Sequence, residues 1–161
     1  MLNGCRIQLD VQPHEILLDV LRYRLGVKSP KCGCDRGDCG TCTVLLNGRT
    51  VRSCLVLAIE VDSQRVTTLE GLMTDGRMTP LQQSFIEHNS FQCGFCAPGV
   101  ILSATELLEQ NPRPNRKQIQ EALSGNLCRC TGYQPILQAI TDATAKPAFA
   151  KQPRKRAEVK S

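Results

Sequence analysis

The amino-acid sequence predicts an α+β protein whose first half forms a small sheet with one helix and whose second half is helical. Alternating apolar and polar residues, typical of strands, occur only before residue 72, whereas apolar residues at helical spacing prevail from residue 79 onward. Each half also carries its own set of four cysteines. We therefore place the boundary between the halves near residues 73–78.

Composition argues against a membrane-spanning or secreted protein. The longest uninterrupted apolar run, residues 54–59, is far shorter than the roughly 18 residues that a membrane span needs. The N-terminus lacks the charged start and apolar core of a secretory signal. We expect a cytoplasmic protein, and because the cytoplasm keeps thiols reduced, the ten cysteines point to metal binding rather than to disulfides.

The net charge of +5 arises entirely from residues 146–161, which contain six basic residues and one acidic residue. The remaining 145 residues contain 14 of each sign and are neutral overall. A balanced domain of this kind gives no reason to expect a nucleic-acid partner. Residues 146–161 have little to bury, and we predict that they form a basic, disordered and solvated tail.

Strand signals occur three times in the first half. Residues 6–11, "RIQLDV", alternate between apolar and polar side chains as a half-buried strand does. Residues 42–54 consist of two apolar runs joined by Asn47 and Gly48, which is a strong signal for a hairpin. Residues 65–71 are the third candidate strand. The sequence thus predicts a small, largely antiparallel sheet.

Helical spacing begins between the first strand and the hairpin, where apolar side chains recur from Ile16 to Leu25 and Gly26 ends the run. In the second half, residues 79–89 form a short amphipathic candidate. Residues 98–110 place their apolar side chains on one face and begin with a proline, which suits the first turn of a helix.

Two further helices are predicted beyond the break at residues 111–115, "NPRPN". Asn115 and Gln118 have the spacing of a capping box, which marks the start of the first of them. The second covers about residues 133–145, with apolar side chains on one face. Helices of this number and length suggest a four-helix bundle.

The first cysteine set lies in and after the glycine-rich loop at residues 31–42, "KCGCDRGDCGTC". Cys34, Cys39 and Cys42 have the spacing C-x4-C-x2-C, and eleven residues separate Cys42 from Cys54. This is the plant-type ferredoxin spacing for a [2Fe–2S] cluster. The interspersed glycines provide the backbone freedom and close approach that a loop around a small anionic cluster requires. A zinc site is the alternative, although zinc sites usually use two separate cysteine knuckles.

The second set combines a C-x2-C motif, Cys93 and Cys96, with a C-x-C motif, Cys128 and Cys130. Each motif precedes a predicted helix, where the helix dipole and unpaired N–H groups favour thiolates. Two such helix starts facing each other would form a four-thiolate cage. Zinc remains an alternative for this set, but next to a ferredoxin-type loop a second [2Fe–2S] cluster is favoured.

The other reactive side chains give weak signals. We expect Cys32 to be a small buried side chain and Cys5 to be structural, because neither fits the two sets. His14 and His88 lie near predicted helix ends and suit surface or capping roles. The sequence shows no nucleophile–base arrangement, phosphate loop or paired carboxylates, and therefore no catalytic residue. These observations favour an electron carrier over a reaction centre.

Five segments together identify a family resemblance: "GCDRGDCGTCTV", "SCLVLA", "TLEGL", "QCGFCAPG" and "GNLCRCTGYQPI". They resemble the iron–sulfur subunit of the xanthine oxidase family of molybdenum hydroxylases, and the resemblance covers about residues 3–143. It implies a β-grasp plant-type ferredoxin domain in residues 1–74. It also implies a four-helix bundle with its own [2Fe–2S] cluster in residues 75–145, followed by the tail at residues 146–161.

The resemblance implies a specific role for each cysteine of the two sets. The cluster nearest the molybdenum cofactor would be held by Cys93, Cys96, Cys128 and Cys130. The cluster nearer the flavin would be held by Cys34, Cys39, Cys42 and Cys54. Gln92 and Cys130 would lie against the pterin of the molybdenum cofactor.

Partner subunits follow from the same resemblance. A large subunit would hold molybdenum with a pterin cytosine dinucleotide and oxidise the substrate by two electrons. This chain would pass the electrons singly to FAD on a medium subunit, within a dimer of heterotrimers. The alternative is a free-standing two-cluster ferredoxin, against which the second, helical half argues because a free carrier has no need of it.

The sequence departs from the family pattern at its start. Most relatives have a full β-strand before the Asn-Gly turn that here begins at Asn3. We therefore expect either a short first strand or a chain start that lies upstream. The two unassigned cysteines, Cys5 and Cys32, are also unusual for the family.

Overall fold

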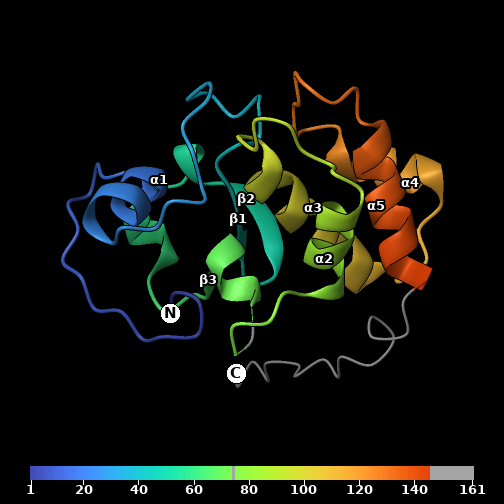
Figure 1. Ribbon diagram of the computed structural model, residues 1–161. Coiled ribbons are helices and arrows are strands. Elements are labelled where there is room, and N and C mark those ends of the chain that lie inside the picture. The colour runs from blue at the N-terminus through green and yellow to red at the C-terminus, as the bar shows by residue number, and fades with distance from the viewer. Residues whose placement is uncertain (74, 146–161) are drawn as a thin grey trace.

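A computed structural model of the chain describes residues 1–73 and 75–145. The first half contains α1 (Leu17–Asp19), β1 (Thr43–Leu46), β2 (Arg49–Arg52) and β3 (Val66–Thr67). The second half contains α2 (Pro80–Glu87), α3 (Ala97–Gln110), α4 (Arg116–Leu123) and α5 (Gln134–Ala145). In Figure 1 the sheet lies between α1 and the later helices. The predicted α+β class is thus confirmed, while the predicted tail lies outside the described residues.

The sheet has the strand order β2-β1-β3, with antiparallel neighbours. The predicted hairpin is confirmed, because β1 pairs with β2 in a register that places Leu46 opposite Arg49. Asn47 and Gly48 connect the two strands with φ angles of 51° and 85°. A tight two-residue hairpin requires positive φ at both positions, which asparagine and glycine tolerate.

The third strand is shorter than the sequence predicts. Only Val66 and Thr67 pair with β1. The chain then turns into a 3-10 helix at Leu69–Leu72, so the prediction for residues 65–71 is confirmed for its first part only.

The prediction of a strand at residues 6–11 is wrong. This segment has no regular secondary structure, and its apolar side chains Ile7 and Leu9 are 42% and 36% exposed. Leu2 occupies the position next to β3 through a bridge to Val66, and Leu2 also pairs with Cys5. Residues 6–11 therefore have no neighbouring strand to pair with, and alternation of side chains cannot form a strand without one.

The helical run before the first cysteine loop is confirmed. The three-residue helix α1 continues as a π-helix at Val20–Arg24, in which Leu25 N–H donates to the Val20 carbonyl at 3.1 Å. Gly26 follows with a φ of +69° and ends the run. Buried leucines of this segment pack against Val44 of β1, which forms the core of the first half.

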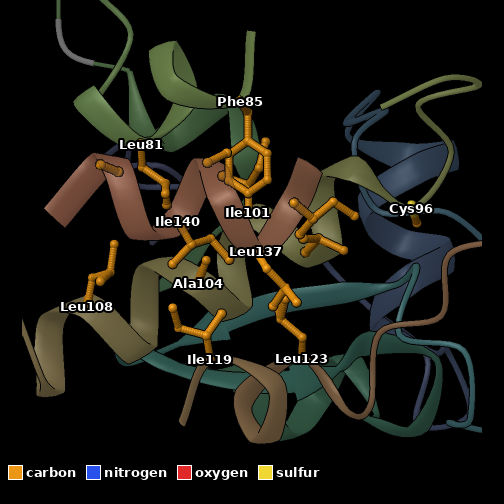
Figure 2. Close-up of a cluster of buried hydrophobic side chains, with 14 residues drawn as sticks. Leu81, Phe85, Cys96, Ile101, Ala104, Leu108, Ile119, Leu123, Leu137 and Ile140 are labelled. Carbon is orange, nitrogen blue, oxygen red and sulfur yellow. The ribbon is translucent and has the colours of Figure 1, made fainter. Parts of the chain in front are cut away.

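The predicted helices of the second half are confirmed. Asn115 and Gln118 form the predicted capping box at the start of α4, and Thr79 and Gln82 form another at the start of α2. No helix in residues 1–73 or 75–145 is long and apolar enough to cross a membrane. Figure 2 shows that the helices share one core, whose labelled side chains include Leu81, Phe85, Ile101, Ala104, Leu108, Ile119, Leu123, Leu137 and Ile140.

A buried asparagine joins the two halves. The Asn126 side-chain amide donates to the Gly40 carbonyl at 3.1 Å and accepts from the Ser103 hydroxyl at 2.7 Å. Arg52, at the end of β2, donates to the Gly125 carbonyl at 2.7 Å. A Cβ atom added at Gly40 would collide with the Gly125 carbonyl, so only glycine permits this approach. We call the hydrogen bonds of Asn126 the Asn126 network.

Substitution of Ile140 by alanine should lower the free energy of unfolding by about 2–5 kcal/mol, because it opens a cavity in the helical core. Ile140 is fully buried, whereas Ile86 on α2 is 56% exposed. Ile86→Ala is therefore the matched control and should change the free energy of unfolding by less than about 0.5 kcal/mol. Urea denaturation of the two variants checks this, and equal losses would contradict the assignment of the core.

Substitution of Asn126 by alanine should destabilise the chain by about 1–3 kcal/mol, because the Gly40 carbonyl and the Ser103 hydroxyl lose a buried partner. Gln138→Ala is the control, because Gln138 is exposed and bonds only one turn away, to Asp142. The measurement is again urea denaturation. A loss for Asn126→Ala no larger than for the control would show that the network does not hold the halves together.

Candidate metal centres

The first cysteine set is assembled by the hairpin. Cys34 and Cys39 lie in the loop before β1, Cys42 directly precedes β1, and Cys54 follows β2 in the 3-10 helix Ser53–Leu55. Because the two strands are antiparallel, their outer ends bring Cys42 and Cys54 together, and the two Sγ atoms are 3.3 Å apart. The pairing of β1 with β2 thus brings Cys54 next to Cys42, although eleven residues separate them in the sequence.

The thiols of this set are arranged as two pairs. Cys42 and Cys54 form the buried pair. Cys34 and Cys39 form the other pair, in which the Cys39 N–H donates to the Cys34 Sγ at 3.4 Å. All ten cysteines of the chain lie in the described residues, and none of them forms a disulfide there.

The two pairs differ in electrostatic environment. Backbone N–H groups of Arg36 and Cys39 donate to the Cys34 sulfur and lower the pKa of Cys34 to about 7. Burial, together with the neighbouring Cys42, raises the pKa of Cys54 to about 12. The outer part of the loop therefore favours an anionic sulfur at Cys34, while burial keeps the Cys54 thiol protonated until a metal replaces its proton.

The second set is formed between the helices. Cys96 is the N-cap residue of α3, as predicted, whereas Cys128 and Cys130 lie in the loop ahead of α5. The Sγ atoms of Cys130 and Cys93 are 3.5 Å apart. The Cys96 and Cys128 thiols are hydrogen-bonded to each other. Each pair thus combines one cysteine of the C-x2-C motif with one cysteine of the C-x-C motif.

The thiols of the second set also differ in pKa because their surroundings differ. A backbone N–H of Phe95 donates to the Cys93 sulfur and lowers the pKa of Cys93, while the hydrogen bond that Cys130 gives to Cys93 raises the pKa of Cys130. Burial raises the pKa of Cys96 to about 12. Burial acts in the same direction on Cys128, but hydrogen bonds led by that of Thr131 lower the pKa of Cys128 overall.

The paired arrangement fits a [2Fe–2S] cluster better than zinc. Such a cluster has two irons, and each iron takes two protein ligands. A structural zinc ion needs all four ligands to converge tetrahedrally on one point. The donor set of four thiols, with N–H groups directed at sulfur, suits an anionic dinuclear cluster at both places.

Sequence analysis missed the residues that support the cysteines. The Thr41 hydroxyl lies 3.3 Å from the Cys39 Sγ. The Tyr133 hydroxyl accepts from the Cys128 N–H at 2.9 Å and donates to the Asn126 carbonyl at 3.0 Å. The positions of Thr41 and Tyr133 in the sequence do not indicate that they contact the cysteines. They come to the cysteines through turns, and Tyr133 has an unusual φ of 68°.

The structure brings Gln92 and Cys130 together. The Gln92 amide donates to the Cys130 carbonyl at 3.2 Å, and both residues are exposed. The unassigned cysteines behave differently. Cys32 is exposed, so the prediction of a buried side chain is wrong, because the neighbouring loop residues Gly33, Asp35 and Arg36 are also exposed and provide no core around it. Cys5 is also exposed, and its backbone forms the bridge to Leu2.

Both histidines have surface roles, as predicted. His14 is exposed. His88 is the C-cap residue of α2, and its Nε2 lies 2.8 Å from the Asp142 carboxylate on α5. Neither histidine is therefore a ligand candidate in this structure.

A direct hydrogen bond connects the two cysteine sets. The N–H of Leu127, the residue before Cys128, donates to the carbonyl of Cys39 at 2.9 Å. The Asn126 network lies immediately beside this contact. The two candidate centres are therefore held at a fixed separation by buried backbone and side-chain hydrogen bonds.

Two families of known proteins match the chain, one for each half. The family described as "2Fe-2S iron-sulfur cluster binding domain" matches residues 1–72, and the family described as "[2Fe-2S] binding domain" matches residues 68–141. The matches cover all eight cysteines of the two sets.

Close relatives cover nearly the whole chain. It is 50% identical to the nicotine 6-hydroxylase small subunit of Paenarthrobacter nicotinovorans, over 88% of this chain and 85% of that protein. It is 46% identical to the nicotinate dehydrogenase small FeS subunit of Eubacterium barkeri, over 91% of this chain and 94% of that protein.

A solved structure agrees with the fold. The similar chain belongs to quinoline 2-oxidoreductase from Pseudomonas putida 86 and has a TM-score of 0.86 with 44% sequence identity. The similarity covers 92% of this chain and 90% of that chain. The chain therefore belongs to the iron–sulfur small subunits of the xanthine oxidase family of molybdenum hydroxylases.

Proposed function

We propose that this chain transfers electrons, one at a time, between the molybdenum–pterin cytosine dinucleotide of a large partner subunit and FAD on a medium subunit. A [2Fe–2S] cluster accepts and releases single electrons, whereas substrate oxidation releases two. Two cluster sites in one chain therefore suit a relay between a two-electron site and a flavin. The carrying observation is that two sets of paired thiols are joined by the hydrogen bond between Leu127 and Cys39.

The proposal assigns four ligands to each cluster. The cluster of the first half is held by Cys34, Cys39, Cys42 and Cys54. The cluster of the second half is held by Cys93, Cys96, Cys128 and Cys130. In support, the Sγ atoms of Cys42 and Cys54 are 3.3 Å apart and those of Cys93 and Cys130 are 3.5 Å apart.

The orientation towards the partner subunits is also part of the proposal. Cys93, Cys130 and Gln92 are all exposed, so this edge of the second cluster site is accessible to the large subunit. The Gln92 amide donates to the Cys130 carbonyl, and no group in residues 1–73 or 75–145 donates to the Gln92 side-chain oxygen, which can therefore accept a hydrogen bond from a bound pterin. We therefore assign Gln92 and Cys130 to contact with the pterin, and the first cluster to the side of the flavin.

The domain assignment follows the two matching families. We propose that residues 1–74 form a β-grasp ferredoxin domain and residues 75–145 a four-helix bundle. The sheet with its flanking helix supports the first assignment, and the shared core of α2–α5 supports the second.

The proposed assembly is a dimer of heterotrimers in the cytoplasm. The names of the relatives given above describe small subunits, which supports a complex rather than a free-standing ferredoxin.

Elemental analysis of the complex, purified through this chain, tests the relay. We expect about four iron and four sulfide per copy of the chain, because each cluster contains two of each, together with molybdenum and FAD from the partners. Iron without molybdenum or larger subunits would support the free ferredoxin instead. Zinc in place of iron would contradict both functions.

Serine substitutions test the ligand assignment within the same complex. Cys39→Ser and Cys128→Ser should each reduce the iron content from about four to about two per chain, because each removes one ligand from a different cluster. Cys32→Ser is the matched control and should retain about four iron, because Cys32 lies in the same loop but outside the paired thiols. Cys39→Ser and Cys128→Ser should each lose a different electron paramagnetic resonance (EPR) signal of the reduced protein, whereas Cys32→Ser should keep both signals. Full iron in Cys39→Ser would exclude that residue as a ligand.

A further inference from the structure

We propose that Lys31 is an electrostatic tuning residue whose ammonium group raises the reduction potential of the second cluster, the one held by the helical half. The inference rests on the proposed function, because it requires that Cys93, Cys96, Cys128 and Cys130 bind a cluster. It goes beyond that function because a residue of the first half controls the reduction potential of the cluster in the second half.

The backbone of Lys31 belongs to the first cysteine loop. Its N–H donates to the Thr41 carbonyl at 3.0 Å, and its carbonyl accepts from the Thr41 hydroxyl at 2.9 Å. The same hydroxyl lies 3.3 Å from the Cys39 Sγ. Lys31 is therefore fixed at both backbone groups, and the direction in which its side chain leaves the loop is set by the first cluster site.

The side chain of Lys31 extends to the segment that carries Cys93 and Cys96. Its Nζ lies 5.5 Å from the centroid of the Phe95 ring, and Phe95 lies between Cys93 and Cys96 in the sequence. This distance is within the range of a cation–π contact. The Nζ also donates to the Ser29 carbonyl at 3.3 Å, which holds the ammonium in place.

The groups around Lys31 act on its pKa in both directions. Burial lowers the pKa of Lys31, and the neighbouring Arg22 acts in the same direction. Glu70, Cys96 and Cys93 act on the Lys31 pKa in the opposite direction and favour the charged form. Because the ammonium of Lys31 is half-buried beside Phe95, solvent and salt screen its charge less than that of a surface lysine.

The effect on the cluster follows from Coulomb's law. A [2Fe–2S] cluster with four thiolates is an anion, and reduction adds one further negative charge. A cation held nearby stabilises the reduced form more than the oxidised form, which raises the reduction potential. Charge is one of the factors by which a protein sets the potential of such a cluster.

The position of Lys31 makes the reduction potential of the second cluster depend on a residue of the first half. The Lys31 backbone holds the loop of one cluster while its charge acts on the other, so the difference between the two potentials depends on how the halves are packed. That difference sets the driving force for electron transfer between the clusters.

EPR-monitored redox titration of the purified complex provides the test, because it follows each cluster separately and needs no substrate. Lys31→Met removes the charge and keeps the aliphatic stem. We expect the ratio of reduced to oxidised second cluster, at a fixed potential, to fall by roughly twofold to tenfold. A tenfold change corresponds to 59 mV for one electron. The first cluster should shift less, and Lys31→Arg should remain near the wild type.

Lys117→Met is the matched control, because it removes the same charge from α4 at a side chain that is 84% exposed. It should shift neither cluster. Lys31→Gln provides a second neutral variant of different shape, should Lys31→Met assemble poorly. Unshifted potentials in the neutral variants, or an equal shift in Lys31→Arg, would overturn the role of the charge. A wild-type complex without two cluster signals would instead overturn the proposed function and the inference with it.

Discussion

The arrangement of both candidate centres depends on one buried interaction, the Asn126 network. Asn126 is nearly fully buried and bonds to Gly40 in the first cysteine loop and to Ser103 on α3. The next residue, Leu127, donates to the Cys39 carbonyl. The loop of the first set is therefore attached to the turn that precedes the second. An unsatisfied buried amide is costly, so the halves remain in register.

Each cysteine set combines thiols of opposite character. Burial raises the pKa of both Cys54 and Cys96 to about 12, while backbone N–H groups lower the pKa of Cys34 and Cys93. Each site thus lies between a protein core and an outer loop of N–H donors. The core side would keep water from a bound cluster, and the loop side would stabilise its negative charge. A relay needs both, because the outer edge must also be within reach of a partner.

Local signals in the sequence were reliable where local chemistry decides the structure. Asn47 and Gly48 tolerate positive φ, and Asn115 with Gln118 forms a capping box whatever lies elsewhere in the chain. The strand predicted at residues 6–11 failed for the opposite reason. Its alternation fits a strand, but strand formation requires a neighbour, and Leu2 already occupies the edge of β3. The prediction that Cys32 is buried failed in a similar way, because spacing in the sequence does not tell whether a loop residue is buried or exposed.

The sequence by itself determined the chemistry of the chain: two sets of four cysteines, their division between a strand-rich and a helical half, and the resemblance to an iron–sulfur subunit. These depend on residue type and spacing, which are read directly. The tertiary structure decided which thiols pair, where Asn126 joins the halves, and that Lys31 from one loop reaches Phe95 of the other set. Such contacts join residues distant in the chain, and they exist only because the sheet and the helices pack against each other.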